Sequence, residues 1–112
     1  MNTQHHLEFL QTADEKLEQC EKNITECNNL FRLALVKEAS AKIEMKQNDK
    51  ESENQFALRV RKETTKERKN VLITERDLRN AVMMFNVLKE RINLAKFLLQ
   101  SEGIKISNQN FQ

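Results

Sequence analysis

Two cysteines and two histidines are the side chains of this 112-residue chain best suited to nucleophilic chemistry or metal binding. Cys20 and Cys27 lie seven residues apart, which on an intact helix means about 10 Å of rise, too far for a disulfide between them. His5 and His6 are adjacent, so on a helix they point to different sides and form no standard metal site with Cys20. We therefore expect no metal. We also expect packed, unreactive thiols, because no neighbouring residue would activate them.

Other catalytic motifs are equally hard to assemble. The chain contains no Pro and a single Gly, so a glycine-rich phosphate-binding loop is excluded. The sequence also shows no clear Ser/His/Asp or Cys/His arrangement for nucleophilic catalysis. The sequence therefore predicts no catalytic residue, no cofactor and no small-molecule substrate, and favours a protein that binds other proteins.

Residues 59–69 form the most basic stretch, with six basic and two acidic side chains. Only Val60 is apolar, so a helix here has little to pack against. A solvated face is the simplest interpretation, followed by a protein partner with acidic grooves. Nucleic acid or acidic lipid is an alternative, but interleaved aromatics and a known nucleic-acid module are missing. The candidate partner-binding residues are Arg59, Arg61, Lys62, Lys66, Arg68 and Lys69.

Apolar residues recur at alternating steps of three and four in both halves of the chain, the spacing of a coiled-coil seam. The polar Glu38 interrupts the first seam, whereas Val82, Met84 and Leu98 widen the second, so we expect the second to contact more than one surface. The first seam contains Leu10, Ala13, Leu17, Cys20, Ile24, Cys27, Phe31, Ala34, Ala41 and Met45. The second contains Val71, Leu78, Ala81, Phe85, Leu88, Ile92, Ala95 and Leu99.

The two seams are out of register across residues 46–56, and residues 46–55 include no apolar side chain. Ser, Asn and Asp in this stretch favour turns and caps, and Ser52 or Asn54 could cap a second helix. The sequence thus predicts an all-α single domain, two long helices forming an antiparallel coiled-coil hairpin. Helix 1 would span about 5–46, the turn about 47–54 and helix 2 about 55–102, with Gly103 as helix stop and a flexible tail over 103–112. The alternative is one continuous helix that absorbs the register change.

The charge distribution fits two arms lying side by side. Residues 1–54 carry seven Lys and Arg against eleven Asp and Glu, whereas residues 55–112 carry twelve against six. The sequence has no apolar run of transmembrane length and does not open with the pattern of a secretory signal. We therefore expect a cytoplasmic protein without membrane insertion.

A short, charged helical hairpin with both termini at one end and a polar turn at the other resembles the central-stalk proteins of type III secretion systems, the FliJ-like or SctO-like family. The resemblance is one of architecture and covers roughly residues 7–102. Size and an Asn- and Lys-rich composition are closest to the Spa-type stalks of virulence-associated systems. No signature motif carries the resemblance, so no functional residue is transferred from the family.

The resemblance implies a central stalk, peripheral to a membrane-embedded secretion apparatus, that couples a hexameric export ATPase to the protein export gate. The paired ends would enter the ATPase, which makes Leu7, Phe9, Phe97 and Leu98 candidate contacts, and residues 46–69 would face the cytoplasmic domain of the gate. Two other classes stay open. A structural coiled-coil scaffold or adaptor would pair its seams with other chains, and a secretion chaperone would bind an exported protein.

Overall fold

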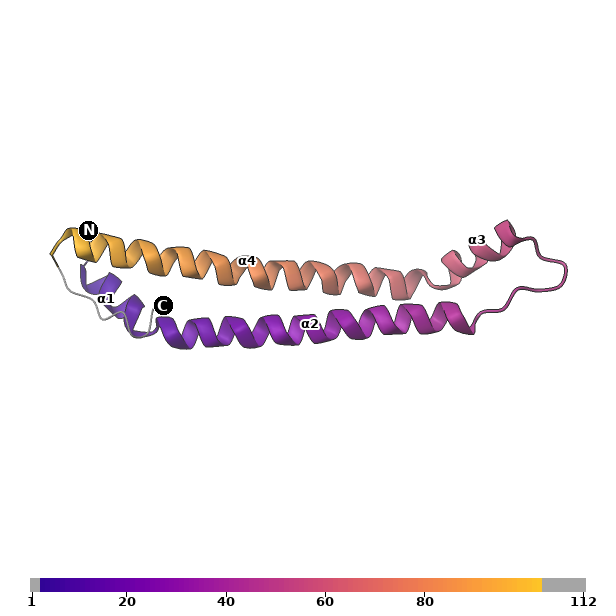
Figure 1. Ribbon diagram of the computed structural model, residues 1–112, viewed down its shortest axis with the longest axis horizontal. Helices are drawn as coiled ribbons and strands as arrows, with labels where there is room; N and C mark the ends of the chain where they lie inside the picture. The colour runs from indigo at the N-terminus through magenta and orange to yellow at the C-terminus, as the bar shows by residue number, and fades with distance from the viewer. Residues whose placement is uncertain (1–2, 104–112) are drawn as a thin grey trace. The chain divides into compact units, whose positions relative to one another are not determined.

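The computed structural model describes residues 3–103, in which every regular element is a helix (Figure 1). The all-α class predicted from the sequence is therefore confirmed. The predicted tail beyond Gly103 lies outside the described residues. The elements are α1 (Thr3–Gln11), α2 (Ala13–Glu44), α3 (Glu53–Glu63) and α4 (Thr65–Ser101).

The contacts between residues divide the chain into two compact units. The terminal unit comprises Met1–Ile24 and Asn80–Gln112, and the central unit comprises Thr25–Arg79. The sequence predicts a single domain. In the structure, the boundaries between the two compact units fall at two points, one within α2 and one within α4.

Both predicted seams are real features of the helices. Every seam position is buried or half-buried, whereas most residues between seam positions are exposed. In the terminal unit the seams supply a core cluster of Leu10, Ala13, Leu88, Ile92, Ala95 and Leu99, with Leu7, Phe9, Leu17 and Cys20 packed against it. The central unit buries fewer apolar residues, chiefly Ala34 and Val71, together with the polar Glu38 and Thr64.

The predicted widening of the second seam is only partly matched by burial. Leu98 is half-buried, but Val82 and Met84 are exposed, with Met84 retaining 61% of its accessible surface. These two side chains therefore have little cover from the part of the chain that the structure describes.

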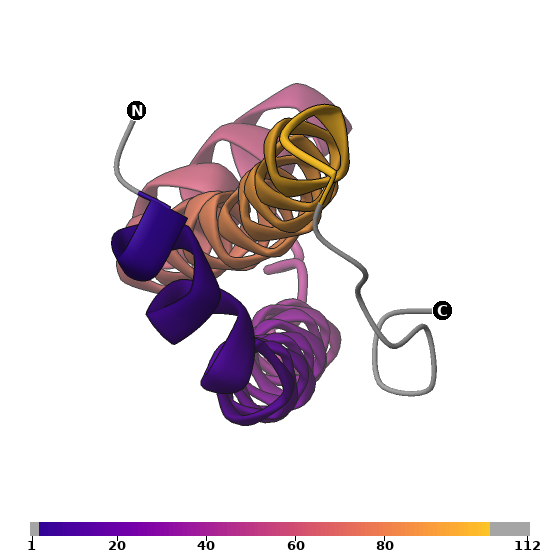
Figure 2. The same ribbon diagram turned by 90° about the vertical axis from the view of Figure 1, so that its left-hand side faces the viewer.

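The helix predicted over about 5–46 is interrupted at Thr12, where α1 turns away from the axis of α2 (Figure 2). The Thr12 hydroxyl donates to the Phe9 carbonyl at 3.1 Å, and the Thr12 amide donates to the same oxygen at 3.2 Å. Local side-chain bonding of this kind competes with the helical ladder. The bend brings Leu7 and Phe9 of α1 against the core cluster.

A similar break at Thr64 divides the helix predicted over about 55–102. The Thr64 hydroxyl donates to the Val60 carbonyl at 2.7 Å, and the Thr65 hydroxyl lies within 3.1 Å of the Arg61 carbonyl and 2.9 Å of the Lys62 carbonyl. Thr64 has φ −104° and ψ 16°, outside the helical region. The hydroxyls of two consecutive threonines thus donate hydrogen bonds to carbonyl oxygens of the last turn of α3. A new helix, α4, begins at Thr65.

Helix α2 stops at Glu44 and helical structure resumes at Glu53, around the predicted turn at 47–54. Of the two predicted caps, Ser52 and Asn54, the structure uses Ser52. Its hydroxyl accepts the Gln55 amide at 3.1 Å, and the Gln55 side chain accepts the Ser52 amide at 2.9 Å, a complete capping box. Gly103, with φ +81°, follows the end of α4 as expected of a glycine stop.

Candidate functional site

The loop between α2 and α3 is held by one arginine of the basic stretch. Arg59 donates through Nε to Glu51 Oε2 at 2.8 Å and through Nη2 to Glu51 Oε1 at 3.0 Å. Nη2 also donates to the Lys46 carbonyl at 2.7 Å, so one guanidinium ties α3 to two points of the loop. This bidentate arrangement is the strong form of an arginine–carboxylate pair.

The same contacts shift the ionisation of both partners. The hydrogen bonds from Arg59 hold the pKa of Glu51 below its ordinary value, with the Asn48 amide, which donates to Oε1 at 3.2 Å, adding to the effect. The Glu51 carboxylate in turn raises the pKa of Arg59. Both Glu51 oxygens are occupied, so this carboxylate is committed to structure and is not poised to exchange a proton with a substrate.

Glu38, the polar residue in the first seam, is buried between two cations. Its Oε1 lies 3.4 Å from Arg68 Nη1 of α4, and its Oε2 lies 3.8 Å from Lys42 Nζ one turn along α2. Oε2 has no hydrogen-bond partner within the described part of the chain, so the Lys42 contact is electrostatic. The two cations compensate a carboxylate that would otherwise be costly to bury.

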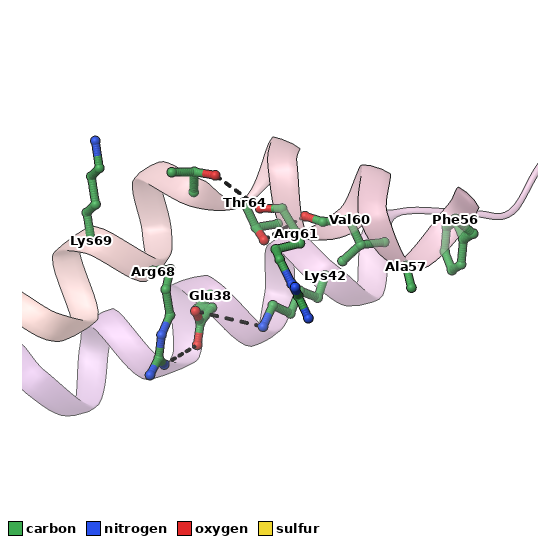
Figure 3. A pocket seen from close by; sticks show the side chains of 10 residues that line it. Glu38, Lys42, Phe56, Ala57, Val60, Arg61, Thr64, Arg68 and Lys69 are labelled. Atoms are coloured by element: carbon green, nitrogen blue, oxygen red, sulfur yellow. Dashed lines mark hydrogen bonds and ion pairs between the residues drawn. The ribbon is translucent and has the colours of Figure 1, made fainter. Parts of the chain in front are cut away.

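Beside this cluster lies a groove of about 710 Å³, called here the α3 groove (Figure 3). Its lining combines apolar side chains of α3 with basic side chains of α2, α3 and α4. In Figure 3, the Lys42 side chain extends toward Glu38, the Arg61 side chain extends from α3 toward α2, and the Lys69 side chain extends away from α2. The lining includes Glu38 and Lys42 of α2, Phe56, Ala57, Val60 and Arg61 of α3, and Arg68 and Lys69 of α4.

The six cations predicted to bind partners are therefore divided among different roles. Arg61, Arg68 and Lys69 line the α3 groove. Lys66 lines a second groove, of about 580 Å³, whose other wall includes Val36 and Ala41 of α2. Arg59 is engaged by Glu51, and Lys62 is exposed and lines neither groove. The sequence did not predict that Lys42 and Glu38 lie beside these residues. Lys42 and Arg68 are 26 positions apart, and only the fold brings them to the same groove.

The candidate contacts near the chain ends also behave differently from one another. Phe9 lies between two cations, with Lys16 Nζ 4.7 Å and Arg91 Cζ 5.1 Å from its ring centre. Leu7 packs against the core cluster and Leu98 is half-buried. Phe97 keeps 63% of its surface exposed, an unusual state for a large aromatic ring. Of the four, Phe97 is the most accessible to a partner.

A methionine-rich groove of about 400 Å³ lies elsewhere in the terminal unit, lined by Met83, Met84 and Val87 of α4 and by Cys20 of α2. His5 and His6, predicted to point to different sides, border one small hollow with their ring centres 5.9 Å apart. Adjacent residues are about 100° apart around a helix, so both rings can still reach one hollow. Within residues 3–103, no three His, Cys, Asp or Glu side chains gather as a metal site would require.

The helices of the described segment are too short or too polar to cross a membrane. Comparison with protein-family models, curated proteins and solved structures found no match for this chain.

Proposed function

We propose that this chain is a non-enzymatic stalk, an antiparallel coiled-coil hairpin in the cytoplasm that binds a hexameric secretion ATPase and couples it to an export gate. One observation carries the hairpin. Contacts join Thr3 to Glu102, Phe9 to Arg91 and Glu38 to Arg68, so the separation along the chain falls from 99 residues to 30 while the sum of the paired numbers stays between 100 and 106. A nearly constant sum supports antiparallel pairing of the two arms.

The distribution of apolar surface supports partner binding over catalysis. The core cluster of the terminal unit is a narrow seam, and large side chains such as Phe97 and Leu94 remain more than half exposed beside it. Exposed apolar groups on neighbouring turns of one helix fit a surface that another protein covers. On the stalk proposal, this surface enters the ATPase and the basic stretch faces the gate.

A structural scaffold is the second candidate, favoured by exposed apolar residues of the central unit. Leu30, Leu33 and Val36 of α2 each keep at least half of their surface exposed. Such a stripe would suit pairing with other chains in place of an ATPase.

The experiment is an ATPase assay with a candidate hexameric export ATPase, with and without the full chain. The stalk proposal expects binding and increased turnover. Phe97→Ser should weaken both, whereas the matched control Leu72→Ser, which also removes an exposed apolar side chain, should leave them unchanged. Absence of both binding and stimulation by the unaltered chain would contradict the stalk.

A further inference from the structure

Helix α3 carries an apolar stripe that the described chain covers only in part. Phe56 and Val60 lie one helical turn apart on one face, both are half-buried, and Arg59 Cζ lies 5.4 Å from the centre of the Phe56 ring. None of the eleven residues of α3 is buried, although the helix is firmly begun by its capping box and tied to the loop through Arg59. A helix so well anchored, with its apolar face only partly covered, offers a surface on which another molecule can pack.

The surroundings of this stripe carry a strong charge bias. Four cations and one carboxylate line the α3 groove, and the carboxylate, Glu38, is already opposed by both Arg68 and Lys42. Arg61 is exposed and makes no ion pair within residues 3–103 (Figure 3). An occupant that places carboxylates near these cations and apolar side chains against α3 would complement both features.

The shape of the lining argues for a peptide over a small molecule. Sites for small molecules rely on a few rigidly placed polar groups. Here the unengaged polar groups are the ends of long, flexible side chains, and the fixed part of the lining is the side of a helix. Helix-in-groove binding uses such a surface, with apolar anchors spaced three and four residues apart. Base stacking, which single-stranded nucleic acid needs, would have Phe56 as the one ring of this lining.

We propose that the α3 groove binds an acidic amphipathic helix of a protein partner. Its apolar anchors pack on Phe56 and Val60, and its carboxylates pair with Arg61 and Lys42. The inference goes beyond the stalk proposal, because it specifies the chemistry of an occupant and holds whether or not an ATPase is bound.

The test measures binding of fluorescent peptides to the full chain by anisotropy at physiological salt. One 20-residue peptide forms an amphipathic helix with Leu on one face and Glu on the other. A second keeps the Leu positions and replaces every Glu with Lys, and a third is the acidic peptide with its sequence scrambled. Only the acidic amphipathic peptide should bind. A 20-nucleotide single-stranded DNA is tested in parallel.

Two pairs of variants locate the site. Arg61→Glu should raise Kd about fivefold through a lost ion pair and a new repulsion, whereas Lys62→Glu, the same charge change one residue away, should change Kd less than twofold. Val60→Gln should raise Kd about fivefold by removing an anchor, whereas Leu58→Gln on the exposed side should not. Circular dichroism checks that all four variants keep the helical content of the parent chain.

Several outcomes would overturn the proposal. These are no saturable binding of the acidic amphipathic helix, equal binding of its scrambled form or of the Lys peptide, and equal losses for Arg61→Glu and Lys62→Glu. Tighter binding of the DNA with the same dependence on Arg61 would assign the groove to nucleic acid. Self-association of the chain that depends on Val60 and excludes the peptide would assign it to a second copy.

Discussion

At the scale of single residues, several charged side chains of the central unit form hydrogen bonds and ion pairs that hold its backbone in place, even where those side chains are partly exposed. Arg59 belongs to the basic stretch, yet its three hydrogen bonds fix the loop at Glu51 and Lys46. Glu38 and Arg68 are 30 residues apart and meet across the seam. A buried carboxylate in an otherwise apolar seam needs its cation nearby and so tolerates few alternative registers, and we infer that this pair helps to align the two helices.

The first residue-scale prediction concerns pH. Because Arg59 lowers the pKa of Glu51, the pair stabilises the folded loop above the carboxyl's ordinary value of 4.5 and loses that contribution as pH falls through the lower folded value. The pKa of Arg59 is raised, so its charge is constant over this range. Nitrogen-15 NMR of the Arg59 side chain should show Nε shifting with a midpoint below pH 4.5.

The control for this titration is Glu51→Gln, which keeps the shape of the side chain and removes its charge. In this variant the low-pH transition of Arg59 Nε should become much smaller, with Glu63, whose Oε2 lies 3.9 Å from Arg59 Nη1, as the other carboxylate beside the guanidinium. A midpoint at or above 4.5 in the unaltered chain, or an unchanged transition in the variant, would contradict the assigned pairing.

The second prediction is an asymmetry between Arg68 and its buried partner Glu38. Arg68→Leu leaves Glu38 buried with Lys42, whose Nζ lies 3.8 Å away, and should reduce the free energy of unfolding by about 1–3 kcal/mol. Glu38→Leu extends the apolar seam and leaves Arg68, whose side chain is 54% exposed, free to reach water. It should be neutral or stabilising by about 1 kcal/mol. Urea unfolding measures both, and equal destabilisation by the two variants would refute the argument.

At the scale of elements, helix positions follow the apolar pattern, whereas helix ends follow local hydrogen bonds. The seams could be predicted because burial of a stripe repeats over many turns, and every seam residue is buried or half-buried. The helix breaks at Thr12 and Thr64 could not be predicted. A threonine whose hydroxyl donates to a backbone carbonyl cannot be distinguished in the sequence from one whose hydroxyl points to solvent. Ser52 could be predicted, since a cap with Gln three residues later is a recognisable pattern.

The candidate site was less predictable than the helices for a related reason. Basic composition singled out residues 59–69 but could not separate Arg59, which is used in the loop, from Arg61, which faces an open groove. The groove also needs Lys42, whose approach to α3 depends on where α2 ends. Composition alone does not contain that information.

The element-scale prediction tests the capping box at the start of α3. Ser52→Ala removes the acceptor for the Gln55 amide and should cost about 1 kcal/mol of local helix stability. Amide hydrogen exchange at residues 54–56 should accelerate about fivefold if those amides exchange through local opening. Ser40→Ala, at an exposed position within α2, is the matched control and should leave exchange in α3 unchanged. Similar rates in both variants would mean that the box does not set the start of α3.

At the scale of the whole molecule, the stalk proposal requires one chain to supply both arms of the coiled coil. The acidic first half and basic second half are consistent with arms that attract each other. The scaffold alternative places the same seams against other chains. The two differ in whether positions far apart in sequence approach each other within one molecule.

The most direct test is a distance measurement by double electron–electron resonance with spin labels on Gln19 and Asn86, both exposed, in a Cys20→Ser, Cys27→Ser background. Diluting the labelled chain with unlabelled chain leaves only distances within one molecule. Antiparallel arms about 8–10 Å apart between axes predict a narrow distribution of about 15–30 Å once the label arms are included. A distance near 100 Å, the length of a continuous helix across these positions, would contradict the hairpin.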